Sequence, residues 1–394
     1  MLELIINQNK DVETVCLVEN GKLVEKYQND AETKKNRLEG NIYAGKVSDI
    51  VPGMQATFVD YGDSKKGLLH LKDAVPQVDE KKQKSENLLE KKITDILKPN
   101  QKVLVQIKKD SNDKKGAKVS THISIPSRYV VFMPNTDIIT ISQKIVDANR
   151  KEELLKIVKN NIPENIGAVI RTSAENASDN EIVEDINKCT KKWQTILDNY
   201  EKSEVGTLIY ESESVQEKVL LDVKVDKITT NSKPEFEKLK KIIEFEKLKG
   251  VKLEYLPRKD LLNMYDLNEQ LQKLKDRKVW LNCGGFITID KTEALTAIDV
   301  NTGKFTGKAD LESTVFKVNK EATTEIVKQL RLQDIGGIII IDYIDMHNDK
   351  NKKEIEELLK EELKHDRAKT QVEGFTKLNL MEMTRKHICS HLDG

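Results

Sequence analysis

The segment from residue 286 to 342 constrains the fold more than any other part of this sequence. Two runs suited to strands, 286–290 and 294–301, are separated by a tight turn. Apolar residues then recur at helical spacing over 310–332, and four consecutive isoleucines follow at 338–341. A helix that connects two strands of one sheet is the usual crossover between parallel neighbours. The segment therefore predicts a compact α/β unit whose strand ends lie at one edge.

Acidic residues stand where both strands end. Asp299 and Asn301 share one face of the first strand because side chains alternate, and Asp342 directly follows the isoleucines. In parallel strands the two carboxylates can meet, and Mg²⁺, which takes one or two carboxylates with waters and substrate phosphate oxygens, would relieve their repulsion. Such an ion polarises a phosphate and activates water, while Asn301 can hold Asp299 by a hydrogen bond. The alternative is that both aspartates only cap turns.

Composition excludes several classes of protein. Lys and Arg total 66, as do Asp and Glu, so the net charge is zero and says little about partners. We expect no membrane association and no secretion, because no long uncharged apolar run and no signal-peptide pattern occurs. The four cysteines form no CxxC pair, which favours reduced thiols in a cytoplasmic protein. His387, Cys389 and His391 alternate and could bind a metal, although a frayed tail is the simpler interpretation.

The first third of the chain is rich in predicted strands. Residues 2–27 alternate like two or three antiparallel strands, which are too few for a domain and need a partner from later in the chain. Five short strands between 41 and 124 predict an OB-type barrel. Its aromatic residues Phe58, Tyr61 and Tyr43 could stack bases, but such residues belong to barrel cores at least as often.

The barrel region also carries the clearest basic patch. Residues 81–120 contain 12 lysines and 5 acidic residues, a local net charge of +7. Within it, 79–98 is expected to be a charged insertion, helical or mobile. Lysines of this density either attract phosphate groups or simply form a solvated face.

A polar loop is predicted after the strand 167–170. This strand delivers Arg171 and Thr172 into the loop, and a helix follows whose start, Ser178 to Glu181, has the capping-box pattern. Beyond it we expect strands at 208–210 and 219–225. A charged helical stretch is expected over 235–280, with one break near Pro257.

Several stretches closely resemble the bacterial ribonuclease E/G family. Residues 41–43 and 58–62 resemble its embedded S1-type barrel, and 168–173 (AVIRTS) resemble its 5′-end sensor. The resemblance runs from the N-terminus to about residue 388. The stretches that resemble the catalytic core are FITIDKTEALTAIDVN at 286–301, QLRL at 329–332, GG at 336–337, IDYIDM at 341–346 and MTRK at 383–386.

The resemblance implies an α/β (α+β) multidomain fold. A split RNase H-like domain would use residues 1–38 and 222–279. An S1-type OB-fold RNA-binding domain (39–124) and a 5′-phosphate sensor region (125–221) would be inserted in it. A DNase I-like α/β subdomain (280–394) would follow.

The implied activity is Mg²⁺-dependent endonucleolytic hydrolysis of single-stranded RNA to 5′-phosphate and 3′-hydroxyl ends, in rRNA or tRNA processing or mRNA decay. Carried over by position, Asp299 and Asp342 would be the ligands of Mg²⁺, for which Mn²⁺ could substitute. Asn301 would be the positioning residue.

Binding roles are implied as well. Arg171 and Thr172 would hold a 5′-monophosphate, since Arg offers a fork of donors to phosphate oxygens and Thr a hydroxyl donor. Phe58 and Lys115 would line the RNA path on the barrel, by stacking and by attraction of phosphates.

The sequence also departs from the family pattern. No CPxC zinc link is present before Gly394, so we expect neither zinc nor a zinc-linked tetramer, which leaves a homodimer open. The sequence ends without a long scaffold segment, which favours a short, ribonuclease G-like form. Gln143 stands where the sensor usually has a second Arg, and Lys369 is another basic position. Leu68 replaces a frequent aromatic residue, so we expect weaker phosphate sensing and weaker stacking.

Two alternatives remain at this level. One is an RNA-binding protein of the same fold with weak or lost catalysis, against which the intact set of Asp299, Asn301 and Asp342 argues. The other is a metal phosphodiesterase that acts on a different nucleic acid.

Overall fold

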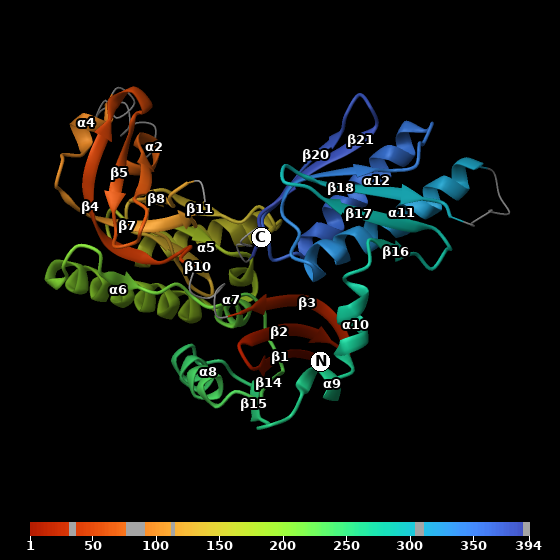
Figure 1. The fold of residues 1–394 in the computed structure, drawn as a ribbon, viewed down its shortest axis with the longest axis horizontal. Helices are drawn as coiled ribbons and strands as arrows, with labels where there is room; N and C mark the ends of the chain where they lie inside the picture. Colours follow the sequence, from red (N-terminus) through yellow and green to blue (C-terminus); the bar gives the residue numbers. More distant parts are fainter. Residues whose placement is uncertain (31–36, 76–90, 112–114, 304–310, 389–394) are drawn as a thin grey trace. The chain divides into compact units, whose positions relative to one another are not determined.

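The computed structural model describes residues 1–30, 37–75, 91–111, 115–303 and 311–388 (Figure 1). The chain forms two compact units of mixed α/β structure. Unit 1 spans residues 1–32, 215–217 and 224–393, and unit 2 spans residues 33–214 and 218–223.

The first sheet of unit 1 joins the N-terminal strands to a distant segment. Its strand order is β15-β14-β1-β2-β3, in which β1 runs parallel to β14 and antiparallel to β2. The prediction that the N-terminal strands take a later partner is therefore confirmed. The five strands are β1 (Leu2–Asn9), β2 (Val12–Glu19), β3 (Lys22–Asn29), β14 (Lys227–Thr230) and β15 (Lys252–Tyr255).

Two expectations for the segment after residue 214 are wrong. The residues 219–225 do not form a strand, because most of them belong to helix α7 (Val215–Asp222), in which Val215 and Val219 are buried one turn apart. The stretch 235–280 is not helical throughout either, since β15 and β16 (Lys278–Trp280) lie within it. Its helices are α8 (Lys233–Phe245), α9 (Leu261–Met264) and α10 (Leu267–Lys273).

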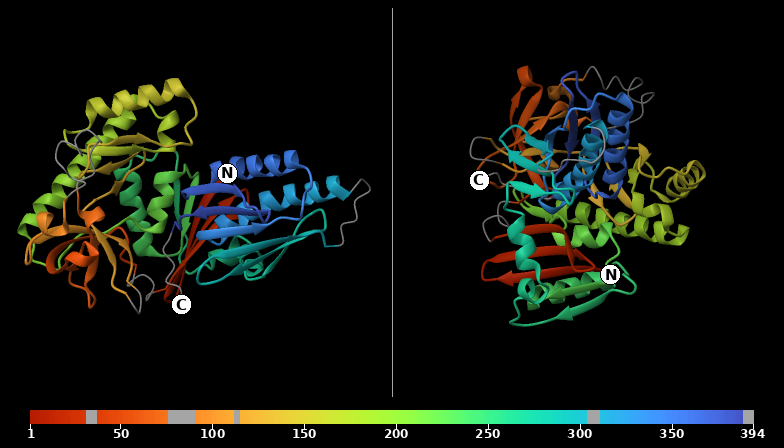
Figure 2. Two further views of the ribbon diagram at one scale, coloured as in Figure 1. Left: turned by 90° about the horizontal axis from the view of Figure 1, so that it is seen from above. Right: turned by 90° about the vertical axis from the view of Figure 1, so that its right-hand side faces the viewer.

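The second sheet of unit 1 has the order β16-β17-β18-β19-β21-β20. Helix α11 (Leu311–Leu332) connects β18 to β19, and these two strands are parallel, which confirms the predicted crossover. Helices α11 and α12 (Asp349–Glu362) pack on one face of the sheet (Figure 2). The remaining strands are β17 (Phe286–Lys291), β18 (Thr296–Asn301), β19 (Gly337–Asp342), β20 (Thr370–Phe375) and β21 (Leu380–Arg385).

A buried arginine fixes the end of this sheet. The guanidinium of Arg385, on β21, is fully buried and donates to the carboxylates of Asp366 (2.7 Å) and Asp334 (2.8 Å). It also donates to the carbonyl oxygen of Ile335 (2.8 Å), so the turn between α11 and β19 is tied to the last strand. Buried charges persist only when they are paired and hydrogen-bonded in this way.

Unit 2 contains a closed five-stranded barrel, as the sequence predicted. The strands follow the order β4-β5-β6-β8-β7, and β7 pairs with β4 to close the ring. Of the expected charged insertion at 79–98, residues 79–90 lie outside the described part, and a short helix α4 (Ile93–Ile96) follows. The barrel strands are β4 (Ile42–Val51), β5 (Ala56–Asp60), β6 (Gly67–His70), β7 (Lys102–Lys109) and β8 (Lys118–Ser120).

A four-stranded sheet with two helices completes unit 2. Its strand order is β11-β12-β10-β9, and the side chains of α5 (Ala148–Asn161) and α6 (Asp179–Lys202) share one core with it. The predicted capping box is present at the start of α6, and the predicted strand β13 (Leu208–Tyr210) pairs with β4. The sheet strands are β9 (Ile125–Pro126), β10 (Val130–Met133), β11 (Ile139–Ile141) and β12 (Gly167–Ile170).

Within the described segments, no helix combines the length and apolar character that a membrane span requires.

A buried carboxylate links the two sheets of unit 1. Glu25, on β3, has a side chain only 1% exposed, and it accepts hydrogen bonds from Arg367 (2.7 Å) and from the hydroxyl of Tyr27 (2.8 Å). Arg331, near the end of α11, lies 3.4 Å away. Burial alone would raise the pKa of Glu25, but the two arginines and the hydrogen bonds outweigh it and lower the pKa.

We predict that Glu25→Gln destabilises the protein at pH 7 by about 3 kcal/mol, because it leaves Arg367 buried without its counter-charge. A folded-state pKa below the unfolded value adds stability that is present above about pH 4.3 and is lost as the pH falls through the folded pKa. The difference in stability between the two proteins should therefore narrow as the pH falls below about 4.3. Urea unfolding from pH 3 to pH 7 measures the difference, and a gap independent of pH would contradict this role.

Candidate active site

The predicted acidic residues lie on the face of the second sheet opposite to α11 and α12. Along β18 the residues alternate, so that Ile298 and Val300 are buried in the core while Asp299 is exposed. Asp342, the last residue of β19, is also exposed and is the direct cross-strand partner of Asp299. The prediction that the two strand ends bring these carboxylates together is confirmed.

Asn301 orients the first carboxylate. Its side-chain nitrogen Nδ2 donates a 2.6 Å hydrogen bond to Oδ2 of Asp299, the contact that the sequence spacing predicted. The chain turns directly after it, at Gly303, whose φ of +61° lies in the left-handed region. A Cβ at Gly303 would lie 2.4 Å from the carbonyl oxygen of Gly284, so only glycine fits this close approach. The turn thus holds Asn301 at the end of its strand.

The site carries a concentration of negative charge. Partial burial raises the pKa of Asp342, and the nearby carboxylates of Asp299 and then Asp345 raise it further. Asp345 lies in the loop after β19, three residues beyond Asp342. In the sequence, only the spacing of three residues from Asp342 suggested that Asp345 could lie near the site. The folded loop shows that the Asp345 carboxylate is close enough to raise the pKa of Asp342.

The donor set suits a hard divalent cation held by few protein ligands. Among the described residues, no group of three or more His, Cys, Asp and Glu side chains is arranged to hold a metal. Two facing carboxylates, one of them oriented by Asn301, match the one or two that Mg²⁺ prefers. His387 bonds to the carbonyl oxygen of Asp334 at 2.8 Å, while Cys389 and His391 lie outside the described residues.

In unit 2, Arg171 and Thr172 leave the end of β12 as predicted, although Thr172 begins a short 3₁₀ helix, η3 (Thr172–Asn176), rather than a loop. Arg171 forms an ion pair with Asp222 and donates to the carbonyl oxygen of Ser127 at 2.6 Å. The hydroxyl of exposed Thr172 lies 2.8 Å from that of Ser142. No local pattern indicated Asp222 as the partner of Arg171, because the two residues are 51 positions apart.

Neighbouring residues shape the same corner of unit 2. The strand β11 runs parallel to β12, so Gln143 follows it at the edge where Arg171 emerges, and the Gln143 side chain is exposed. Arg150, on α5, donates to the carbonyl oxygens of Glu175 (2.9 Å) and Ala177 (2.6 Å). It therefore braces η3, a role that sequence inspection missed because it depends on contacts between distant segments. Lys369 is exposed in unit 1.

The barrel aromatics divide into two groups. Phe58 alternates with buried Thr57 and Val59, is half-buried, and pairs across strands with Leu68. Tyr61 is buried in the barrel core, and Tyr43 packs against it with ring centroids 5.4 Å apart. Phe58 therefore faces outward and is open to a ligand, while the two tyrosines are structural. Lys115 is exposed close to strand β8.

Comparisons with known proteins agree with the sequence resemblance. The profile of the "Ribonuclease E/G family" matches residues 124–388. Ribonuclease G of Escherichia coli (strain K12) is 36% identical over 394 residues, which covers 98% of this chain and 79% of that protein. Ribonuclease G of Haemophilus influenzae is 35% identical over all of this chain and 81% of its own length. Ribonuclease E of Buchnera aphidicola is 34% identical, again over all of this chain but over 41% of its own length.

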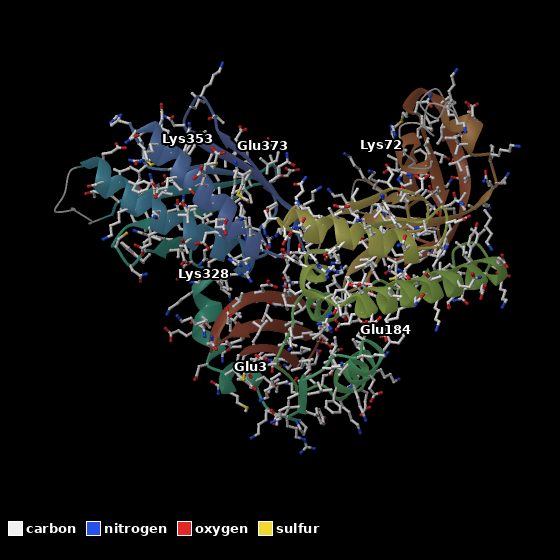
Figure 3. The ribbon with its side chains drawn as sticks, turned by 180° about the vertical axis from the view of Figure 1, so that it is seen from behind. Glu3, Lys72, Glu184, Lys328, Lys353 and Glu373 are labelled. Atoms are coloured by element: carbon white, nitrogen blue, oxygen red, sulfur yellow. The ribbon has the colours of Figure 1, made fainter. Side chains whose placement is uncertain are left out.

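We predict that, without divalent metal at pH 7, Asp342→Asn does not lower thermal stability and raises it slightly, by up to about 2 °C. The raised pKa of Asp342 means that its charged form is unfavourable in the folded state, so the repulsion grows as the pH rises through that pKa. Differential scanning fluorimetry in EDTA measures the effect. Glu373→Gln, which removes an exposed carboxylate from the edge strand β20 (Figure 3), is the matched control and should leave stability unchanged.

Proposed function

This chain belongs to the ribonuclease E/G family, and from that premise we propose that it hydrolyses single-stranded RNA internally with Mg²⁺ held by Asp299 and Asp342. Membership of this family makes the chain an endoribonuclease. The metal, the residues and the products are the proposal. The direct cross-strand pairing of Asp299 with Asp342, with Asn301 bound to Asp299, is the observation that carries it.

Three residues would have separate roles in the hydrolysis of RNA. Asp299 and Asp342 would bind the cation, and Asn301 occupies one oxygen of Asp299 so that the other is directed toward the ion. A bound Mg²⁺ supplies charge that polarises the scissile phosphate and lowers the pKa of an attacking water. The water oxygen forms a bond to phosphorus as the bond from phosphorus to O3′ breaks, which leaves 5′-phosphate and 3′-hydroxyl ends. The open face of the sheet allows an extended RNA strand to reach these groups.

The finer architecture forms part of the proposal. An RNase H-like domain divided between 1–38 and 222–279 is supported by the sheet that joins β1 to β14. The closed barrel supports an S1-type domain at 39–124. A DNase I-like subdomain at 280–394 is supported by the sheet with both helices on one face.

A 5′-phosphate sensor at 125–221 would use Arg171 and Thr172. The guanidinium of Arg171 already faces a carboxylate, that of Asp222, so a 5′-monophosphate would have to take the place of this internal anion. The hydroxyl of Thr172 is exposed and close to Ser142, in position to donate to a phosphate oxygen. With uncharged Gln143 at the same edge, we propose that sensing operates with one strong cation and is correspondingly weak.

The barrel would contribute to the binding of RNA. The half-buried ring of Phe58 can stack a base, and the exposed ammonium of Lys115 can attract a phosphate. We propose substrates among precursors of rRNA or tRNA and among mRNAs, in the cytoplasm, with a homodimer as the working assembly. A protein that only binds RNA would not need the paired carboxylates.

We predict that the protein cuts 5′-monophosphorylated, AU-rich single-stranded RNA internally when Mg²⁺ is present, and that EDTA stops the reaction. Asp299→Asn and Asp342→Asn should each lower kcat by at least about 100-fold, because each removes one of two metal ligands. Gel analysis of end-labelled RNA measures the rate, with Glu373→Gln as a control. Cutting by both Asn variants at the wild-type rate would reject the assigned site, and equal cutting of single-stranded DNA would favour a different phosphodiesterase.

A second prediction concerns the 5′ end. Arg171→Ala should remove the preference for a 5′-monophosphate over a 5′-hydroxyl, whereas Asp222→Asn should strengthen it several-fold by taking away the competing carboxylate. The ratio of kcat/KM for two oligonucleotides that differ only at the 5′ end measures this preference. No preference in the wild type would mean that this corner of unit 2 does not sense phosphate.

A further inference from the structure

The open face of the catalytic sheet continues past the paired carboxylates to its edge strand. In the cross-strand register, Asp342 is opposite Asp299, Asp299 is opposite Thr288, and Thr288 is opposite Lys278 on β16. Directly paired residues point to the same face of a sheet. Lys278 therefore lies in one row with the two acidic residues, at the end of that row.

A second row runs beside the first. Trp280 on β16 is opposite Phe286 on β17, and Phe286 is opposite Asn301. From the spacing of strands and of residues along them, Trp280 lies about 12 Å from Asp299 across the face. The aromatic pair is thus on the same surface as the proposed metal ligands and within reach of an RNA strand that lies over them.

The three side chains form one cluster. The ammonium of Lys278 lies 3.9 Å from the ring centroid of Trp280 and 3.5 Å from that of Phe286. The two rings meet edge to face, with centroids 5.4 Å apart. Cation–π attraction favours this position of the ammonium beside the two rings.

Trp280 is nevertheless 60% exposed. A tryptophan that serves only the core would bury its indole, which is the largest apolar side chain. Here the indole is left open to solvent with a cation beside it, on a strand of only three residues. Exposed aromatic surface combined with positive charge is the composition of sites that bind single-stranded nucleic acid.

We propose that Trp280, Phe286 and Lys278 form a stacking subsite for a nucleotide that flanks the scissile bond. The base stacks on the indole of Trp280, Phe286 supports the indole from the side, and Lys278 pairs with the adjoining phosphate. The inference rests on the proposed function, because RNA is the occupant that lies across Asp299 and Asp342 on this face. Stacking of this kind accepts any base and holds the strand in place for the cut.

A binding experiment can follow the fluorescence of Trp280 directly. The chain has two tryptophans, so Trp193→Phe leaves Trp280 as the only indole. In EDTA, which prevents cleavage, a single-stranded RNA oligonucleotide should quench the fluorescence of this variant. An oligonucleotide of the same length with abasic sites should quench it far less. Equal quenching by both oligonucleotides would overturn the stacking role.

The kinetic test separates this inference from the proposed function. Trp280→Ala should raise KM about 5- to 100-fold with little change in kcat, while Trp280→Phe retains most of the affinity. Phe245→Ala removes an aromatic side chain of similar exposure (57%) from α8 and is the matched control. An unchanged KM for Trp280→Ala, with a wild type that cuts RNA, would reject the subsite alone. A wild type that does not cut RNA would reject the proposed function, and the fluorescence test would still decide the subsite.

Light scattering tests whether Trp280 is a contact between two copies of the chain rather than a contact with RNA. A second copy of the chain could instead cover Trp280. The wild type and Trp280→Ala should show the same mass in solution. A dimer that dissociates only in the variant would mean that Trp280 is a self-association contact and would overturn the proposal.

Discussion

The parallel pairing of β18 with β19 is the constraint on which the candidate active site depends. Four cross-strand partners fix the register, and a shift by one residue would move Asp342 away from Asp299 and turn it toward the core. The buried side chains of α11 and α12 hold this register from the other face of the sheet. Burial of the apolar face thus sets the position of the acidic residues, although none of them belongs to the core.

A second constraint acts where β19 begins. Arg385 belongs to the MTRK segment that resembles the family signature, yet its side chain is fully buried and binds Asp334 and Asp366. These contacts connect the entry of β19 to β21, on the side of β19 away from β18. A segment that looked functional in the sequence therefore has a structural role here, since it fixes the strand that carries Asp342.

The sequence predicted those elements whose evidence is local. The strands and helix between 286 and 342 could be predicted because their periodicity is strong and long, and Asn301 because it is two positions from Asp299. The strands β14 and β15 were missed because each has only four residues, and each depends on a parallel neighbour far away in the chain. The prediction of a strand at 219–225 was wrong because consecutive apolar residues fit a buried helix as well as a strand.

The parts of the site that escaped prediction depend on long-range contacts. The pairing of Asp222 with Arg171 joins residues 51 positions apart. The proximity of Lys278 and Trp280 to Asn301 and Asp299 depends on the register of three strands. Residue type suggested candidates at the strand ends, but only the sheet showed which side chains share a face. The same register now connects a proposed metal site to a proposed stacking subsite.

The most direct test of the central claim counts bound metal ions. Mn²⁺ can take the place of Mg²⁺ and gives an electron paramagnetic resonance signal when free, so a titration yields the number of ions bound per chain. If Asp299 and Asp342 hold the metal, the wild type binds one ion and the double variant Asp299→Asn and Asp342→Asn binds none with comparable affinity. Undiminished binding by the double variant would contradict the claim that these two carboxylates hold the metal.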